Sequence, residues 1–198
     1  LVKAVQDGFV PESKIDEAAL RIVRTILAFD RVHKEYDMSV VGCKEHIALA
    51  KRAAEESIPL IKNKNLLPLD KKKVKKLAVL GKLADYENIG DHGSSCVYPK
   101  YVVTPLQGIA AVAPDVQVIF EDGSDLEAAK KAAAEADAVV IVAGYNFDDE
   151  GEYISGDDFG SMSGAAESVG GDRKPGLGLH KDEVELIQAA GPENPNSV

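Results

Sequence analysis

Ala138-Val-Val-Ile-Val-Ala-Gly144 runs directly into Tyr145-Asn-Phe-Asp-Asp-Glu-Gly-Glu-Tyr-Ile154, and a Gly/Ser-rich segment then leads to Gly170-Gly-Asp-Arg173. The first part is short, β-branched and uninterrupted by polar residues, which predicts a buried parallel strand. The remainder predicts a long loop at the carboxyl end of that strand. In open α/β sheets, ligand sites gather at the carboxyl ends of strands. A functional site is therefore expected here.

This loop concentrates negative charge over a few positions. It carries four carboxylates, at Asp148, Asp149, Glu150 and Glu152. Crowded carboxylates raise one another's pKa, as a general acid near neutral pH requires. The alternative interpretation is a solvated acidic loop, since runs of charge usually lie on the surface.

The residues around this strand alternate between strand and helix patterns. Two further apolar runs, 76–81 and 116–120, predict strands. Helices are predicted from Thr104-Pro105 to about Val112, from a Ser124/Glu127 capping box to Ala136, and over 181–190. Right-handed crossovers of this kind predict an α/β fold with a mostly parallel sheet flanked by helices.

The first third of the chain has a different pattern. A helix is predicted after Pro11, capped by Ser13, and its apolar stripe comprises Ile15, Ala19, Ile22, Val23, Ile26 and Leu27. A polar linker and a second helix over 44–56 follow. The segment 58–62 contains a proline, which predicts an edge strand or an extended covering arm. Because no strand precedes the first helix and 192–198 resembles a turn into a further strand, we expect a fragment of a longer protein.

Composition excludes several classes of function. The 198 residues carry a net charge of −10, which argues against nucleic acid as a partner. No apolar run approaches the roughly 20 residues that span a membrane. Cys43 and Cys96 are far apart and show no zinc-ligand spacing, so we predict no metal and two free thiols, with a single Cys43–Cys96 bridge as the alternative. The segment after the first strand has neither dinucleotide-binding glycines nor a Walker lysine, so no nucleotide cofactor is expected.

A second polar loop, Gly90-Asp-His-Gly-Ser-Ser95, follows the first strand. Asp91 and His92 could face a ligand, and simple turn chemistry is the alternative. In the long loop, Arg173 could form an ion pair with the acidic cluster, and an ordinary exposed pair worth under about 1 kcal/mol is the alternative. The remaining histidines, at 33, 46 and 180, are interpreted as surface or capping residues.

Taken in order, a series of segments resembles glycoside hydrolase family 3 β-glucosidases. Residues 1–8 and 15–22 look like the last helical region of that family's first domain, a (β/α)8-type barrel. The further matching segments are His46-Ile-Ala-Leu-Ala-Lys-Arg-Ala-Ala-Glu-Glu-Ser57, Leu60-Ile-Lys-Asn63, Leu66-Leu-Pro-Leu69, Asn88-Ile-Gly-Asp-His-Gly-Ser-Ser95, Val103-Thr-Pro-Leu-Gln-Gly-Ile109, Glu150-Gly-Glu-Tyr-Ile154 and Gly171-Asp-Arg173. The ordered series is more specific than any single motif.

The resemblance implies a domain organisation. Residues 1–36 would be the C-terminal tail of the barrel domain and 37–45 a linker. Residues 46–198 would be part of the family's second domain, an α/β sandwich, with the acid/base loop at about 145–173. The barrel segment that carries the nucleophilic aspartate has no counterpart in this chain.

The resemblance also implies a reaction and site residues. The family hydrolyses β-linked sugars with retention, using an aspartate nucleophile and an acid/base glutamate, without a cofactor. Glu150 and Glu152 are both candidates for the acid/base, with Glu150 slightly preferred. Asp91 and His92 would line the substrate site, whereas Asp172 and Arg173 would shape the loop.

Partners and rival functions follow from the same comparison. The expected partners are a β-linked oligosaccharide or glucoside and the missing barrel domain, in the same or a separate chain. One alternative is that the isolated chain is a non-catalytic α/β module that binds sugar weakly or packs against a partner. The other is an unrelated doubly wound ligand-binding domain, which the ordered motifs disfavour.

Overall fold

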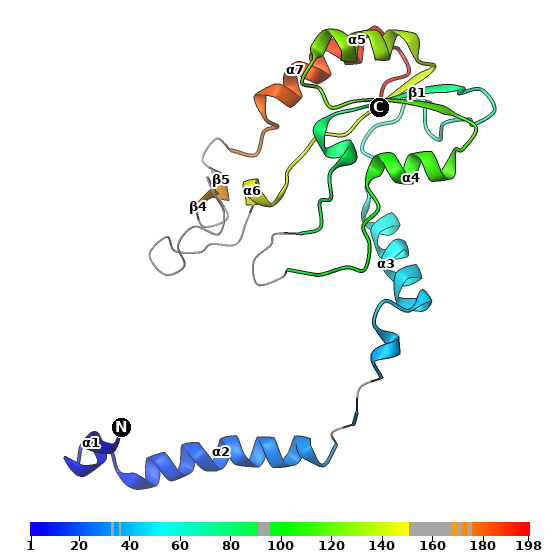
Figure 1. Cartoon of the computed structure of the whole chain (residues 1–198). Helices are drawn as coiled ribbons and strands as arrows, with labels where there is room; N and C mark the ends of the chain where they lie inside the picture. Colours follow the sequence, from blue (N-terminus) through cyan, green and yellow to red (C-terminus); the bar gives the residue numbers. More distant parts are fainter. Residues whose placement is uncertain (33, 36, 91–95, 151–167, 170–171, 174–175) are drawn as a thin grey trace. The chain divides into compact units, whose positions relative to one another are not determined.

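The computed structural model describes residues 1–32, 34–35, 37–90, 96–150, 168–169, 172–173 and 176–198 (Figure 1). The chain divides into two compact units, Leu1–Glu55 and Glu56–Val198. The elements in order are α1 (Val2–Gln6), α2 (Glu12–Asp30), η1 (Met38–Val40), α3 (Lys44–Ser57), β1 (Lys76–Leu80), η2 (Lys82–Asp85), α4 (Pro105–Val112), β2 (Gln117–Glu121), α5 (Leu126–Glu135), β3 (Ala138–Ile141), α6 (Phe147–Glu150), β4 (Ser168–Val169), β5 (Asp172–Arg173), α7 (Lys181–Ala190) and η3 (Gly191–Glu193).

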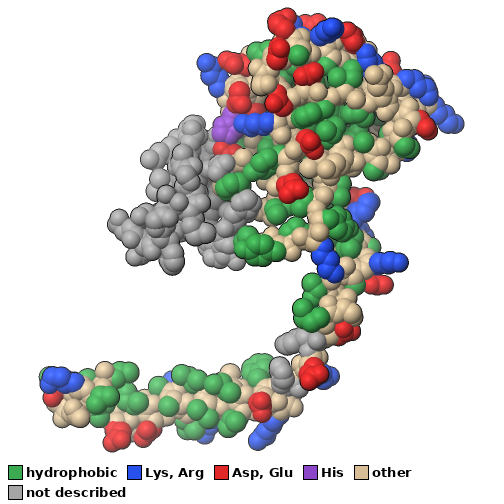
Figure 2. Space-filling model, in the orientation of Figure 1, with side chains coloured by type: hydrophobic (Ala, Val, Ile, Leu, Met, Phe, Trp, Pro, Cys, Tyr) green, Lys and Arg blue, Asp and Glu red, His purple; other side chains and the backbone are tan. Residues whose placement is uncertain are grey.

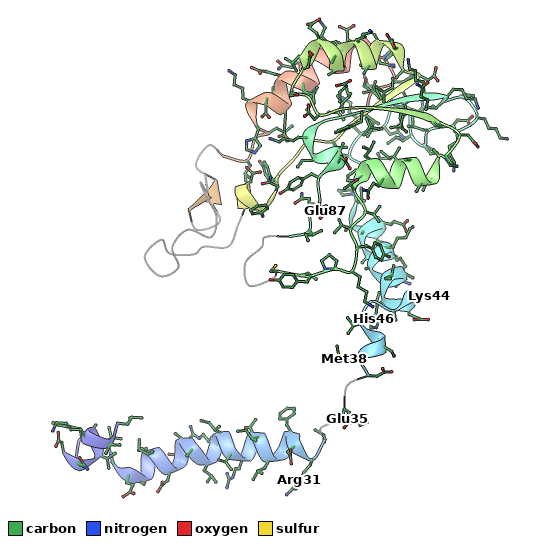
Figure 3. All side chains as sticks on the ribbon, in the orientation of Figure 1. Arg31, Glu35, Met38, Lys44, His46 and Glu87 are labelled. Atoms are coloured by element: carbon green, nitrogen blue, oxygen red, sulfur yellow. The ribbon has the colours of Figure 1, made fainter. Side chains whose placement is uncertain are left out.

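The first unit is mainly helical and has no buried residue in α1, α2 or η1. Apolar side chains of α2 lie on the molecular surface (Figure 2). Arg31, Glu35, Met38 and Lys44, labelled in Figure 3, are exposed along the segment that leads from α2 to α3. Helix α2 starts at Glu12 with Pro11 as its N-cap, so the predicted cap at Ser13 is wrong. The fixed φ of proline suits the start of a helix, and the N–H of Lys14 already donates to the Pro11 carbonyl at 2.9 Å.

The second unit is built on a parallel sheet in the order β2-β1-β3. The chain moves from β1 to β2 and then back across β1 to β3. Figure 1 shows α4 on one face of the sheet and α5 with α7 on the other. The predicted α/β fold, a mostly parallel sheet flanked by helices, is confirmed.

Alternate residues of β1 supply the two cores. Ala78 and Leu80 pack with α5 and α7, including the buried side chains of Ala129 and Leu186. The intervening β1 residues, Leu77 and Val79, pack toward α4. This period of two is what a strand buried on both faces requires.

The last residues of the chain continue the sheet beside β3. The N–H groups of Val139 and Ile141 donate to the carbonyls of Asn196 and Val198 at 3.0 and 2.8 Å, and Ser197 forms a parallel bridge with Val139. The sequence predicted a turn at 192–198 followed by a further strand, but strand pairing with β3 already begins at 196–198.

Two local predictions in the second unit are wrong. Segment 58–62 forms no strand, so the edge-strand interpretation is wrong, because Pro59 has no N–H to donate to a ladder. The alternative, an extended arm, stays a prediction. Helix α5 is capped by Asp125 and not by Ser124. The Asp125 carboxylate accepts from the N–H groups of Glu127 and Ala128 at 3.0 Å each, and an ionised acceptor makes the stronger hydrogen bond.

Candidate active site

The carboxyl ends of β1 and β3 lie side by side, and their connections leave toward opposite faces of the sheet. This is the topological switch point of the sheet, where ligand crevices form in doubly wound folds. Gly81 follows β1 with φ +105°, and a Cβ placed there would lie 2.2 Å from the carbonyl oxygen of Val142. The two strand ends therefore come so close that only glycine fits at this position.

The loop that follows β1 is closed at its base by Asp85 and Thr104. The Thr104 hydroxyl donates to the Asp85 carboxylate at 2.9 Å and accepts from the N–H of Gln107 at 3.3 Å. The Gln107 side chain accepts in return from the N–H of Thr104, which completes a capping box at the start of α4. The segment that contains Asp91 and His92 lies between these two fixed ends.

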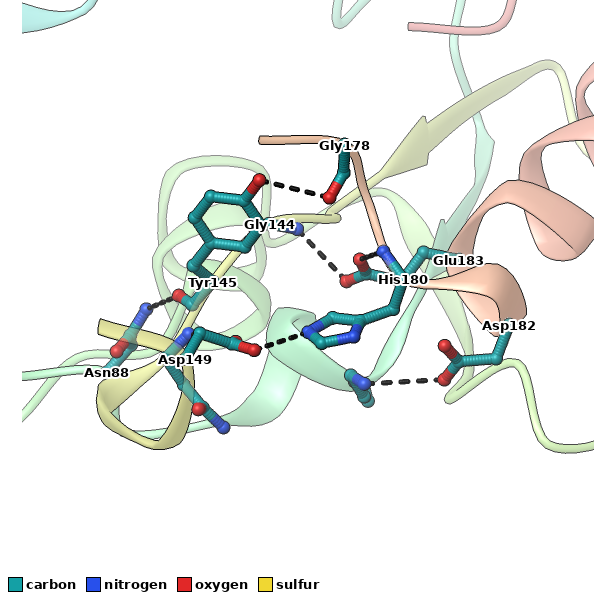
Figure 4. A network of polar contacts seen from close by, with 10 residues as sticks. Asn88, Gly144, Tyr145, Asp149, Gly178, His180, Asp182 and Glu183 are labelled. Carbon is teal, nitrogen blue, oxygen red and sulfur yellow. Dashed lines mark hydrogen bonds and ion pairs between the residues drawn. The ribbon is translucent and has the colours of Figure 1, made fainter. Parts of the chain in front are cut away.

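The chain leaving β3 is fixed by contacts with its neighbours at the same edge of the sheet (Figure 4). The side-chain amide of Asn88 donates to the carbonyl of Tyr145 at 2.8 Å. The hydroxyl of Tyr145 donates to the carbonyl of Gly178 at 3.0 Å, so the loop after β1, the exit of β3 and the approach to α7 are linked.

Asp149 and His180 form the central contact of this network. Nε2 of His180 lies 2.6 Å from Oδ1 of Asp149, and the Asp149 side chain is only 8% exposed. The other carboxylate oxygen of Asp149 accepts from the N–H of Asn146 at 3.0 Å. The His180 ring packs edge-on against Tyr145, with ring centroids 6.3 Å apart. Asp149 is therefore buried with partners on both oxygens, which a solvated acidic loop would not show.

A second buried carboxylate, Glu183, lies one turn into α7. It is 4% exposed, and its two oxygens accept from the N–H groups of Gly144 and His180 at 3.0 and 3.2 Å. One carboxylate thus anchors both the end of the β3 strand and the start of α7.

Beside this network, Lys82 and Asp182 pair at 3.3 Å. Partial burial raises the pKa of Asp182, but the hydrogen bond and charge of Lys82, together with backbone donors, outweigh it and leave the pKa below its usual value. Asp182 is therefore ionised at neutral pH and complements the positive end of α7.

The structure places the predicted site residues as follows. Glu150 is the last residue of α6, directly after Asp149, and the backbone of β5, which consists of Asp172 and Arg173, pairs with β4 and contacts α6. The side chains of these three residues lie outside the described part of the chain. Glu152, Asp91 and His92 also lie outside the described residues.

The residue that the sequence reasoning underestimated is His180. It stands at the N-cap position of α7, which agrees with a capping residue, but it is half-buried against Asp149 and so is not a surface residue. No local spacing signals this pair, because its two members are brought together only by the crossover from β3 to α7. The acidic run at 148–152 identified the right neighbourhood through Asp149.

Within the described residues, no three His, Cys, Asp or Glu side chains lie close enough to hold a metal ion. Both cysteines are free thiols. In the same part of the chain, every helix is too short or too polar to cross a bilayer.

Comparison with known proteins identifies the family. The family model "Glycosyl hydrolase family 3 C-terminal domain" matches residues 58–198, which is more than half of the chain. The chain belongs to glycosyl hydrolase family 3. The predicted family resemblance is confirmed, and the α/β unit that contains the Asp149–His180 network is the C-terminal domain of the family 3 architecture.

Individual relatives and a solved structure are similar to the same chain. A "Beta-xylosidase" of Formosa agariphila is 32% identical over 88% of this chain, and a "Beta-glucosidase" of Wickerhamomyces anomalus is 25% identical over all of it. The crystal structure of a "Beta-D-glucoside glucohydrolase" from Trichoderma reesei has the same fold, with a TM-score of 0.76 at 24% identity over the whole chain. The family 3 chain described here spans about a quarter of the length of these curated relatives, 24% and 28%.

Proposed function

We propose that the complete protein is a retaining β-glycosidase that hydrolyses terminal β-linked sugars, and that this chain supplies its acid/base loop. The observation that carries the proposal is the position of the acidic segment. It starts in α6, the first element after β3, at the switch point of a family 3 C-terminal domain. The relatives' names, beta-xylosidase and beta-glucosidase, support a β-linked glucoside or a close relative as substrate.

The proposed reaction uses two carboxylates. An aspartate on the barrel domain attacks the anomeric carbon, and Glu150 or Glu152 first protonates the leaving oxygen and then activates water. Retention requires the two carboxyl groups to lie about 5–5.5 Å apart, so this loop must reach the barrel's site. No cofactor takes part in this scheme.

The other predicted residues take supporting roles in the proposal. Asp91 and His92, in the loop closed by Asp85 and Thr104, line the substrate site. Asp172 and Arg173 shape the acid/base loop, and the contact between β5 and α6 supports that role. Residues 1–36 form the end of the barrel domain, and the exposed apolar stripe of α2 is consistent with a helix that packs on a larger domain.

Replacement of each glutamate in the complete enzyme tests the proposal. We expect Glu150→Ala to lose most turnover and to regain it with azide on an activated aryl glycoside, because azide replaces the water that the missing base would activate. If Glu152→Ala behaves in this way, Glu152 is the acid/base. If neither variant is rescued, the assignment of the loop is wrong.

A second candidate function concerns this chain by itself. A non-catalytic α/β module is favoured by the share of the relatives that the chain spans, because the proposed nucleophile belongs to the barrel. Hydrolysis of 4-nitrophenyl β-glucoside by the purified 198-residue chain distinguishes the two. Turnover by this chain alone would require a nucleophile among its own residues. No turnover by the chain alone, with activity restored when the barrel domain is added, would support catalysis by residues of both domains.

A further inference from the structure

The geometry points to the Asp149–His180 pair as a positioning device that holds the two ends of the acid/base loop together and thereby aims the catalytic glutamate. The inference rests on the proposed function of that loop. It assigns to both residues a role in the reaction without contact with the substrate.

The first support is the burial of the pair. The side chains of Asp149 and His180 are 8% and 23% exposed, and their polar atoms meet at 2.6 Å. A carboxylate with so little access to water is stable only when it is paired and hydrogen-bonded. Removal of the imidazole therefore leaves a strongly desolvated acid and displaces the residue that carries it.

The second support is where the two residues stand in the chain. Asp149 lies on α6, one residue before Glu150 and three before Glu152, and His180 starts α7 on the other side of the loop. Two neighbouring contacts join the same two flanks. In the first, the hydroxyl of Tyr145 donates to the carbonyl of Gly178. In the second, the Glu183 carboxylate accepts from the N–H groups of Gly144 and His180 (Figure 4).

The third support is that both carboxylate oxygens of Asp149 are engaged within the protein. One oxygen meets His180 and the other accepts from the N–H of Asn146. Because these contacts and its burial hold Asp149 in place, Asp149 orients its neighbours, and the acid/base role falls to the glutamates that follow it.

The contact does not require one particular charge state. Nε2 of His180 carries a hydrogen in the imidazolium and in one neutral tautomer, so it donates to Asp149 in either form. Among the described residues, the nearby charged and titratable groups are Glu183 and Asp182 on α7, Lys82 paired with Asp182, and the phenol of Tyr145.

Misplacement of a catalytic group by about 1 Å can cost roughly 100-fold in rate. A misaimed acid matters most when the leaving group is a poor one, because a good leaving group departs without a proton. The expected signature is therefore a loss that depends on the leaving group, which a general loss of stability would not produce.

The experiment uses the complete enzyme and three variants, His180→Ala, His180→Gln and Asp149→Asn, with two β-glucosides. One substrate carries a 2,4-dinitrophenyl group and the other an alkyl group. We expect His180→Ala to lose about 10–100-fold in kcat/KM on the alkyl glucoside and less than about 3-fold on the dinitrophenyl glucoside. Glutamine restores an Nε2 donor, so His180→Gln should recover part of the loss, and Asp149→Asn should lose activity in the same leaving-group-dependent manner.

Lys181→Ala is the matched control. Lys181 adjoins His180 in sequence, but its side chain is 90% exposed and pairs only at the surface with Glu185, so both substrates should react as in the wild type. Equal losses on the two substrates, or no loss, in the folded His180 variants would overturn the inference. If His180→Ala does not fold, the same comparison of losses in kcat/KM on the alkyl and dinitrophenyl glucosides is made with His180→Gln and Asp149→Asn.

Azide rescue of Glu150→Ala and Glu152→Ala, measured alongside the His180 variants, distinguishes the acid/base function of the loop from the positioning role of the Asp149–His180 pair. Rescue of one of them, with His180 variants that behave like Lys181→Ala, removes only the positioning role. Failure of rescue in both removes the proposed function of the loop and the positioning role together.

Discussion

Helices α2 and α5 have similar amphipathic patterns and opposite surroundings. Helix α5 buries Ala129, Ala132 and Ala133 against the sheet and α7, whereas α2 has no buried residue and its Ile26 is 61% exposed. An apolar stripe therefore predicts that a face will be covered, but it does not say by what. The sheet of the second unit supplies the cover for α5, and none of the described residues of the first unit supplies one for α2.

The largest expected effect tests the close packing at the switch point, which the exposed helix lacks. Gly81→Ala would place a Cβ 2.2 Å from a backbone oxygen at φ +105°, and we expect about 4 kcal/mol of destabilisation. Hydrogen exchange of the β1 amides measures this loss. Gly90→Ala is the control, because φ is +122° but nothing lies within 4 Å, so it should cost markedly less. Equal losses at the two glycines would mean that backbone strain, and not the strand contact, dominates.

The next effect compares the two helical faces directly. Leu186 of α7 is buried in the core shared with α5, so Leu186→Ala should cost about 3 kcal/mol through lost burial and a cavity. Ile26→Ala in α2 should change the stability of this chain by less than about 0.5 kcal/mol. The same exchange measurement serves both variants. A large loss on Ile26→Ala would break the comparison, because it would show that α2 is covered within this chain.

A smaller effect is expected from a buried amide that closes the sheet unit. Asn194 is 6% exposed, and its side-chain NH2 donates to the carbonyls of Ala133 and Ala136 at 2.9 and 2.6 Å. Asn194→Ala leaves both carbonyls without this donor and should cost about 2 kcal/mol. Urea unfolding followed by circular dichroism measures it. An unchanged midpoint would show that the Asn194 amide adds nothing to the packing and backbone pairing that hold the C-terminal residues in place.

The smallest effect tests whether a hydrogen-bonded carboxylate at the surface of the sheet unit, and not only its buried core, adds to the stability of that unit. The N–H groups of Lys75 and Lys76 donate to the Asp137 carboxylate at 2.7 and 2.9 Å and hold its pKa below the usual value. Such a group stabilises the fold fully above its unfolded pKa of about 3.9, and this stability is lost as the pH falls through the lower folded pKa.

Asp137→Asn should therefore lower the urea midpoint at pH 7 slightly, and the difference from the wild type should shrink as the pH falls below about 4. Urea titrations between pH 2 and 7 check this. A difference that is constant with pH would mean that the charge of Asp137 contributes nothing to stability.

The sequence predicted the sheet and its helices because their periods are local and regular. It also located the acidic segment after β3. The segment 58–62 was misjudged because an apolar run does not reveal whether a core lies beside it. Ser124 was chosen as a cap over Asp125 because both residue types suit the position, and the choice depends on backbone geometry.

The Asp149–His180 contact could not be predicted for a different reason. Its members belong to different elements, and only the path from β3 to α7 brings them together. Taken alone, His180 suggested a surface or capping role, and Asp149 was one of four carboxylates in an acidic run. Contacts that depend on the crossover of the chain need the fold before they can be recognised.

The hydrogen bond between Asp85 and Thr104 has a consequence for how such a domain can diversify. Because the two ends of the intervening segment are fixed to the sheet unit and to α4, its length can change without disturbing either. Each doubling of such a loop costs only about 0.6 kcal/mol in closure entropy. The segment between them can thus be lengthened, shortened or replaced while the sheet and α4 stay unchanged.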